Sequence, residues 1–247
     1  MDMNEHQGHR QRLRDTFVQT GIEGMPDHQV LELLLTYALP RRDVNPLAHR
    51  LLDRFGTLEK VLTAPVDQLK QVPEMGESAA VFLSLLGQTE RRILLQRYRG
   101  EKERPVLLST PSRLCGYMLA LSQQDRYETL RLVCLDKRYA LIHEAVISVG
   151  SLTEVLADPR LVLEAALLHK ACFIALGHNH PSGDVTPSRE DVQVAERIEA
   201  AAEAVGIGVV DQLILGRSAA YSLRTQRVLA FTGPDLVTDM PLEEFRA

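Results

Sequence analysis

The chain has 247 residues, a hydrophobic content of 45% and a formal net charge of −5 at pH 7. This composition supports packed cores in one large or two modest domains, and it excludes a strongly basic nucleic-acid-binding body. No apolar run approaches the ~20 residues that a membrane-spanning helix needs, so no membrane association is predicted. The polar start lacks a signal-peptide core and the three cysteines form no C-x-x-C pair, which predicts a cytoplasmic protein with reduced thiols.

Charged residues mark the domain organisation. Acidic and basic residues balance in residues 1–106, so the net charge of −5 comes from the remainder. A charged stretch at Gly100–Arg104 predicts the boundary between a domain at 1–104 and a second domain at 105–231. Basic residues cluster at Arg10, Arg12 and Arg14, and again at Arg91, Arg92, Arg97 and Arg99. A solvated helix face is the favoured interpretation of these clusters.

The first half has the pattern of an all-α domain. Apolar residues at helical spacing are interrupted by prolines and by Gly56, which separate the predicted helices. The helices are expected at Asp27–Ala38, Asn45–Phe55, Leu58–Thr63, Val66–Gln71 and Glu77 to about Arg99.

The segment Leu69–Ala79 resembles a helix-hairpin-helix, in which small residues let backbone N–H groups approach a phosphate. Glu74 stands where the first glycine of the usual G-x-G is found, and Glu77 follows nearby. Two carboxylates would repel a phosphate. The segment is therefore either a nucleic-acid contact or a packing module that keeps only the hairpin's shape.

The second half alternates strand and helix patterns and predicts a mixed sheet wrapped by helices, not a Rossmann array. Helices are expected at Pro111–Leu121, at Asp158–Lys170 and from Ser188 onward. Strands are expected at Thr129–Leu135, Tyr139–Val149, Ala171–Leu176, Val209–Leu215 and Ala220–Arg224, the first two as a hairpin. The tail from Thr232 to the last residue, 232–247, is expected to be loosely ordered.

Potential metal ligands follow the buried strand. His178 and His180 are two residues apart in an extended segment, so both imidazoles point to one side. Asp191 lies one turn inside the helix that begins at Ser188. Two histidines and a carboxylate leave the fourth position of a tetrahedral zinc open for water, which is the catalytic arrangement. The sequence therefore predicts one zinc per chain, although iron, cobalt or manganese fits the same ligands.

Two further residues have competing interpretations. Ser188 with Asp191 also matches a capping box, in which the hydroxyl accepts the helix's first free N–H groups. Glu144 is the candidate base for a zinc-bound water, because a carboxylate in an apolar strand needs an explanation. Alternatively, Glu144 is a salt-bridged acid or simply lies at a strand end. His143 and His169 are expected to be packing or surface residues rather than ligands.

Glu144, His178-Asn179-His180, Ser188 and Asp191 resemble the JAMM motif of MPN-type metalloproteases. The string HNHPSGDVTPSREDV, with an MPN-like body at about 109–229 and a helical domain before it, is similar to the bacterial RadC family. The resemblance implies an α+β chain whose carboxy-terminal domain has a cytidine-deaminase-like architecture. It also implies zinc-dependent cleavage of a peptide or isopeptide amide bond, with Glu144 as base and Ser188 as oxyanion donor.

Alternative functions remain open at this point. The family's traditional label implies a DNA-associated factor in repair or recombination, with nucleic acid bound through the amino-terminal domain. MPN domains also serve as scaffolds in which a metal site is structural or vestigial, and their sheets present surfaces for a homodimer. The sequence does not identify the substrate.

Overall fold

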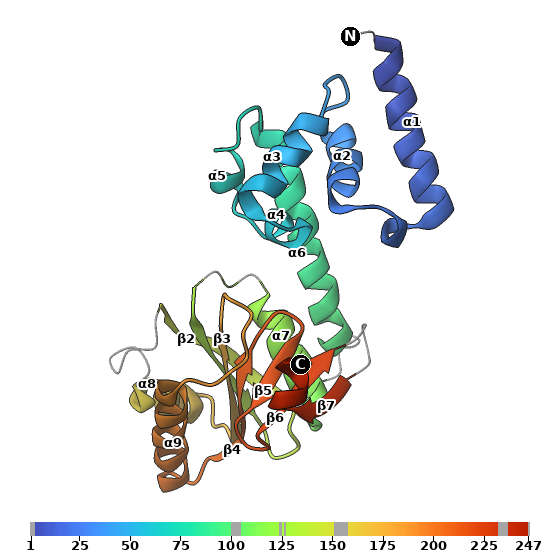
Figure 1. Cartoon of the computed structure of the whole chain (residues 1–247). Coiled ribbons are helices and arrows are strands. Elements are labelled where there is room, and N and C mark those ends of the chain that lie inside the picture. The colour runs from blue at the N-terminus through green and yellow to red at the C-terminus, as the bar shows by residue number, and fades with distance from the viewer. Residues whose placement is uncertain are drawn as a thin grey trace. The chain divides into compact units, whose positions relative to one another are not determined.

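A computed structural model describes residues 3–99, 105–123, 125, 127–150, 158–231 and 237–246. The chain divides into two compact units, Met1–Arg92 and Ile93–Ala247, so the division falls inside helix α6 (Glu77–Arg99) (Figure 1). The boundary predicted at Gly100–Arg104 lies outside the described residues. Among the helices of the described ranges, none is long and apolar enough to cross a bilayer.

The first unit is helical, as predicted. It contains α1 (Met3–Thr20), a 3-10 turn η1 (Ile22–Gly24), α2 (Asp27–Ala38), α3 (Asn45–Phe55), α4 (Leu58–Leu62), α5 (Val66–Leu69) and the first part of α6. Leu31, Leu47 and Leu83 are among the residues that form its core. The α1 helix is absent from the sequence prediction, because its polar residues give little apolar periodicity. Leu13 anchors it by packing against Met25 and its neighbours.

The second unit is built on one seven-stranded sheet in the order β2-β1-β3-β4-β5-β6-β7. Its strands are β1 (Thr129–Leu135), β2 (Leu141–Val149), β3 (Phe173–Asn179), β4 (Gly208–Leu215), β5 (Ala219–Ser222), β6 (Arg227–Phe231) and β7 (Val237–Pro241). Among these described strands, β3 and β4 alone pair in parallel, and the other neighbours are antiparallel. Its helices are α7 (Pro111–Ser122), α8 (Pro159–Leu168), α9 (Arg189–Ala204) and α10 (Leu242–Arg246). The predicted mixed sheet wrapped by helices is therefore confirmed.

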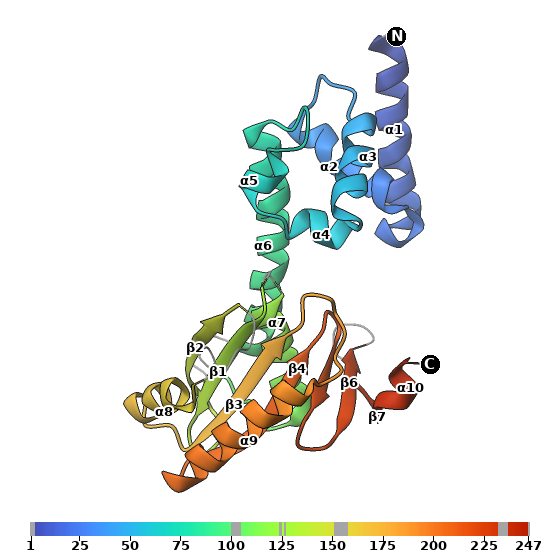
Figure 2. The ribbon, with the colours of Figure 1, turned by 60° about the vertical axis from the view of Figure 1, so that its left-hand side comes forward.

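Helices cover both faces of this sheet, with α8 and α9 on one side and α7 on the other (Figure 2). Successive residues of β1 point to opposite faces, because side chains alternate along a strand. Val133 and Leu135 pack with Tyr117 of α7, whereas Leu130 and Leu132 pack with α8 and α9. Any residue paired with β1 can therefore be assigned to one face or the other.

The carboxy-terminal segment differs from its prediction. Residues 232–236 lie outside the described residues, but Val237–Pro241 pairs with β6 as an edge strand and is followed by α10. Met240 and Leu242 pack against a core that contains Val228 and Ala230. This strand is short and alternates only weakly, so its order comes from tertiary pairing that a local pattern does not reveal.

Candidate metal centre

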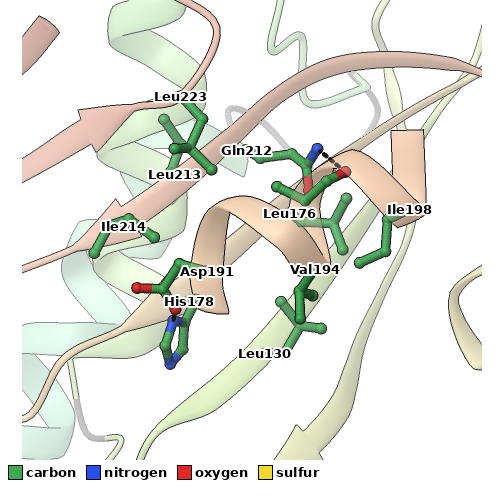
Figure 3. A pocket seen from close by; sticks show the side chains of 11 residues that line it. Leu130, Leu176, His178, Asp191, Val194, Ile198, Gln212, Leu213, Ile214 and Leu223 are labelled. Atoms are coloured by element: carbon green, nitrogen blue, oxygen red, sulfur yellow. Dashed lines mark hydrogen bonds and ion pairs between the residues drawn. The ribbon is translucent and has the colours of Figure 1, made fainter. Parts of the chain in front are cut away.

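His178, His180 and Asp191 come together at the end of β3. Within the described residues they are the one group of three or more potential ligand side chains whose donor atoms lie within 4.8 Å of one another. His178 Nδ1 is 3.2 Å from Asp191 Oδ1, and His180 Nε2 is 3.5 Å from Asp191 Oδ2. Figure 3 shows His178 on the strand facing Asp191 on the helix beside it. The predicted ligand set is thus assembled from two adjacent elements.

Strand β3 positions the two histidines. It lies inside the sheet, where His178 is opposite Leu130 of β1 and Ile214 of β4. The backbone N–H of His180 donates to the carbonyl of Leu215 at 2.9 Å, which continues the pairing just beyond the strand. A turn follows, in which Gly183 has a φ of 87° that favours glycine. The backbone around both histidines is therefore fixed by neighbouring strands.

Helix α9 positions Asp191 through a capping box at its amino terminus. The hydroxyl and the backbone N–H of Ser188 each donate to Asp191 Oδ2 at 2.7 Å, and the Asp191 N–H donates to Ser188 Oγ at 3.1 Å. The capping interpretation of Ser188 is therefore correct. Its hydroxyl proton is engaged by Asp191, so Ser188 orients the carboxylate in this structure.

The two imidazoles have different environments. His180 Nδ1 lies 2.7 Å from the carbonyl oxygen of Asp184, a contact that orients the ring and leaves Nε2 toward Asp191. His178 is 5% exposed; its Nδ1 has only the Asp191 carboxylate nearby, at 3.2 Å, and its Nε2 is buried without a hydrogen-bond partner in the described part of the chain. A buried polar group without a partner costs about 1–3 kcal/mol. A metal ion would satisfy a nitrogen of this ring, so the donor set fits a resident cation.

The cluster is electrostatically coupled. Burial alone would raise the pKa of Asp191, but His178, His180 and the two Ser188 donors together hold it far below its usual range. Asp191 in turn raises the pKa of His180. The metal-free site therefore keeps a carboxylate anion at neutral pH, and His180 holds a proton more readily than a free imidazole does. A metal ion would displace that proton, because a ligating histidine must be neutral.

A small pocket adjoins the two buried ligands. Its lining is mostly aliphatic, and Leu130, Leu176 and Ile198 are among the side chains that line it with His178 and Asp191 (Figure 3). Charge interactions are stronger beside such a lining than in water, because the local dielectric is lower.

Glu144 is not brought to this cluster. It is paired with Val133, so its side chain lies on the α7 face of the sheet, where its carboxylate accepts a hydrogen bond from the hydroxyl of Tyr117. His178 is paired with Leu130, which packs on the opposite face with α8 and α9. The sheet therefore separates Glu144 from Asp191, and the Glu144 carboxylate is hydrogen-bonded to Tyr117 instead.

A different acid, Glu128, lies beside the histidines. Antiparallel pairing of Leu130 with His178 places Glu128 level with His180 when the register is continued by two residues. Side chains two apart share a face, so Glu128 and His180 lie on the same side. The charge of the half-buried Glu128 also contributes to the raised pKa of His180. No sequence pattern singles out Glu128, because it precedes its strand and only the strand register links it to His180.

His143 and His169 are outside the cluster, in agreement with the prediction. Their rings stack on each other with centroids 3.6 Å apart, His143 from β2 and His169 from the end of α8.

The hairpin-like segment of the first unit has its own charge pairing. Glu74 has a left-handed φ of 69°, the conformation in which glycine is usual. Its carboxylate lies 3.3 Å from Arg42 Nη2 and 3.0 Å from Arg50 Nη2. A phosphate at this loop would have to displace Glu74 from both arginines.

Comparison with known proteins gives consistent matches. The family described as "RadC-like JAB domain" matches residues 108–228. A UPF0758 protein of Ruegeria pomeroyi is 37% identical over 221 residues, which cover 90% of this chain and 97% of that protein. A UPF0758 protein of Rhodobacter capsulatus is 38% identical over 217 residues, with 88% and 100% covered. A third, from Fusobacterium nucleatum, is 30% identical over 225 residues, with 90% and 97% covered.

Proposed function

This chain belongs to the bacterial RadC family, and on that premise we propose that it is a zinc-dependent hydrolase of the JAMM type acting on a peptide or isopeptide amide bond. The observation that carries the proposal is the His178–His180–Asp191 cluster, in which a buried carboxylate meets two imidazoles and His178 lacks other partners. Such a set suits a catalytic metal, because three protein ligands leave a position for water.

The chain's own residues supply the remaining chemistry. A zinc ion, when bound, would act as a Lewis acid that lowers the pKa of a water toward neutrality. His178, His180 and Asp191 would hold it. Glu128 would take a proton from the attacking water as general base and then deliver it to the leaving amine. We assign this role to Glu128 rather than Glu144, because Glu128 shares the face of the histidines.

Ser188 has two roles in this proposal. Its hydroxyl first orients Asp191 through the capping box. To stabilise an oxyanion it would redirect that proton toward the substrate, while its backbone N–H keeps the bond to Asp191. Removing comparable oxyanion donors costs ~2.7–4 kcal/mol of transition-state stabilisation.

The experiment that tests the proposal is metal analysis of chelator-free protein by mass spectrometry. We expect about one zinc per chain in the wild type and its loss in a His178→Ala/His180→Ala variant, because ligand loss removes the site. Peptide and isopeptide libraries would then be screened with the zinc-loaded protein, and the variant is the control. Wild-type protein that takes up no metal from added zinc would refute the proposal.

A nucleic-acid role is the second candidate, and the hairpin-like loop between α5 and α6 is the observation that favours it. Glu74→Gly would release Arg42 and Arg50 and relieve the left-handed glutamate. We expect this variant to bind duplex DNA more tightly than the wild type in a fluorescence anisotropy titration. Tight wild-type binding that the substitution weakens would instead make Glu74 part of a working interface.

A further inference from the structure

Asn179, which lies between the two histidines, ties their strand to the segment that carries Glu128. Its side chain is turned away from both imidazoles, because side chains alternate along β3. Its Oδ1 accepts a hydrogen bond from the Thr129 N–H at 2.8 Å. Its Nδ2 donates to the carbonyl of Tyr127 at 3.2 Å, and to that of Asp125 at 3.5 Å. The residue is 5% exposed, so these bonds are shielded from water.

The two shorter bonds reach the peptide groups on either side of Glu128. Thr129 N belongs to the peptide bond that follows Glu128, and Tyr127 O belongs to the one that precedes it. A carboxamide suits this position, because it offers an acceptor and a donor in one rigid plane. One side chain therefore sets the path of the backbone through Glu128 relative to β3.

Other contacts hold Asp125 and Glu128 of this segment in place. Asp125 accepts two hydrogen bonds from the guanidinium of Arg131, at 2.6 and 2.5 Å, with both side chains largely buried. The carbonyl of Glu128 accepts from the Gly150 N–H at 2.7 Å. These contacts anchor the segment to β1 and to the end of β2, whereas Asn179 connects it to the strand of the ligands.

We infer that Asn179 is a positioning residue, which holds Glu128 at a fixed distance from His178 and His180 by bonding the backbone on both sides of it. The inference rests on the proposed function, in which Glu128 is the base. A displacement of about 1 Å in a catalytic group can cost about 100-fold in rate, so a tether of this kind has a functional effect. It also gives the middle residue of the His-Asn-His string a role distinct from metal binding.

The test compares Asn179→Ala and Asn179→Asp with the wild type. Alanine removes all of the side-chain bonds, whereas aspartate keeps an acceptor for Thr129 but loses the donor to Tyr127. Ser222→Ala is the matched control, since it removes a buried 2.7 Å hydrogen bond to Asp211 in the same sheet, away from the cluster. The wild type and the three variants are all studied as full-length proteins, with and without metal.

The first readout is amide hydrogen exchange in the metal-free proteins. We expect exchange at Glu128 and Thr129 to quicken by about tenfold in Asn179→Ala and less in Asn179→Asp, with no local change in Ser222→Ala. Unchanged exchange in Asn179→Ala would overturn the inference, because the tether would then contribute nothing to the order of the segment.

The second readout is the visible spectrum of the cobalt-substituted proteins during a pH titration. We expect Asn179→Ala to bind cobalt with wild-type stoichiometry, but to shift the spectral titration toward that of Glu128→Gln. Asn179→Ala should add no further shift in a Glu128→Gln background, since the two residues act through one group. A full additional shift there would overturn the inference alone, whereas a wild type that binds no cobalt would overturn the proposed function and the inference with it.

Discussion

Substituting the two candidate bases separately gives opposite expectations for stability and activity. Glu144→Gln replaces a carboxylate that accepts a hydrogen bond from the buried Tyr117 hydroxyl with a neutral amide that can still accept one. A bond to a charged group contributes about 1.5–3 kcal/mol and a neutral one about 0.5–1.5, so the free energy of unfolding should fall by about 1 kcal/mol. Glu128→Gln removes a half-buried charge and should change that free energy by less.

Activity should show the reverse pattern. Loss of a general base typically lowers kcat by about 10²–10⁴, so Glu128→Gln should lose nearly all hydrolysis of a peptide that the wild type cleaves. Glu144→Gln should retain kcat within about threefold, because its face of the sheet is separated from the ligands.

The assay for this pair combines urea unfolding, zinc competition and steady-state kinetics on the same preparations. Both variants should bind zinc as the wild type does, since neither removes a ligand. Full loss of hydrolysis in Glu144→Gln with wild-type stability, together with an active Glu128→Gln, would refute the assignment made from the strand register.

Three further outcomes are expected. Ser188→Ala should lower the free energy of unfolding by about 1 kcal/mol and weaken zinc affinity by about 10–100-fold, because the Ser188 side chain both caps α9 and orients the ligand Asp191. Urea unfolding and chelator competition measure the two effects, and unchanged values for both would contradict this expectation. Asp191 raises the pKa of His180, so the stabilisation from their pairing is fully present below the unfolded histidine value of about 6.5 and is lost as pH rises through the higher folded value. Asp191 stays ionised throughout that pH range, because its pKa is lowered. The melting temperature of the metal-free protein should therefore fall as the pH rises through the folded pKa of His180, while zinc affinity increases. A melting temperature that does not change with pH would contradict the coupling between His180 and Asp191. Burial raises the pKa of Cys115 to about 12, so mass spectrometry after maleimide treatment of native protein should find label on the exposed Cys172 and none on Cys115.

The ligand set was predictable because its geometry is local. The i, i+2 spacing of His178 and His180 places both side chains on one side of any extended strand. The position of Asp191, three residues after the helix cap, places its side chain beside that cap in any helix. The structure adds only the approach of these two elements, which occurs where β3 and α9 meet.

The base was not predictable by the same reasoning, because it depends on pairing between distant segments. Glu144 lies in an apolar strand and was conspicuous for that reason, but its partner is a tyrosine on α7 that no local pattern connects to it. Glu128 comes near His180 only through the register of β1 against β3. A shift of one residue in that register would turn Glu128 to the other face, so sequence spacing alone cannot select it.

Asp191 belongs both to the ligand cluster and to the capping box of α9, and this double role affects how a loss of activity can be recognised among related chains. Ser188 and Asp191 stabilise the start of α9 whether or not catalysis occurs, so selection for folding alone would preserve them in an inactive descendant. His178 does not cap the helix: its Nδ1 contacts only Asp191 Oδ1, at 3.2 Å, and its Nε2 is buried without a partner among the described residues. The histidines are therefore the residues whose replacement would mark a lineage that has abandoned the reaction, whereas an intact serine–aspartate pair records only that the helix still needs its cap.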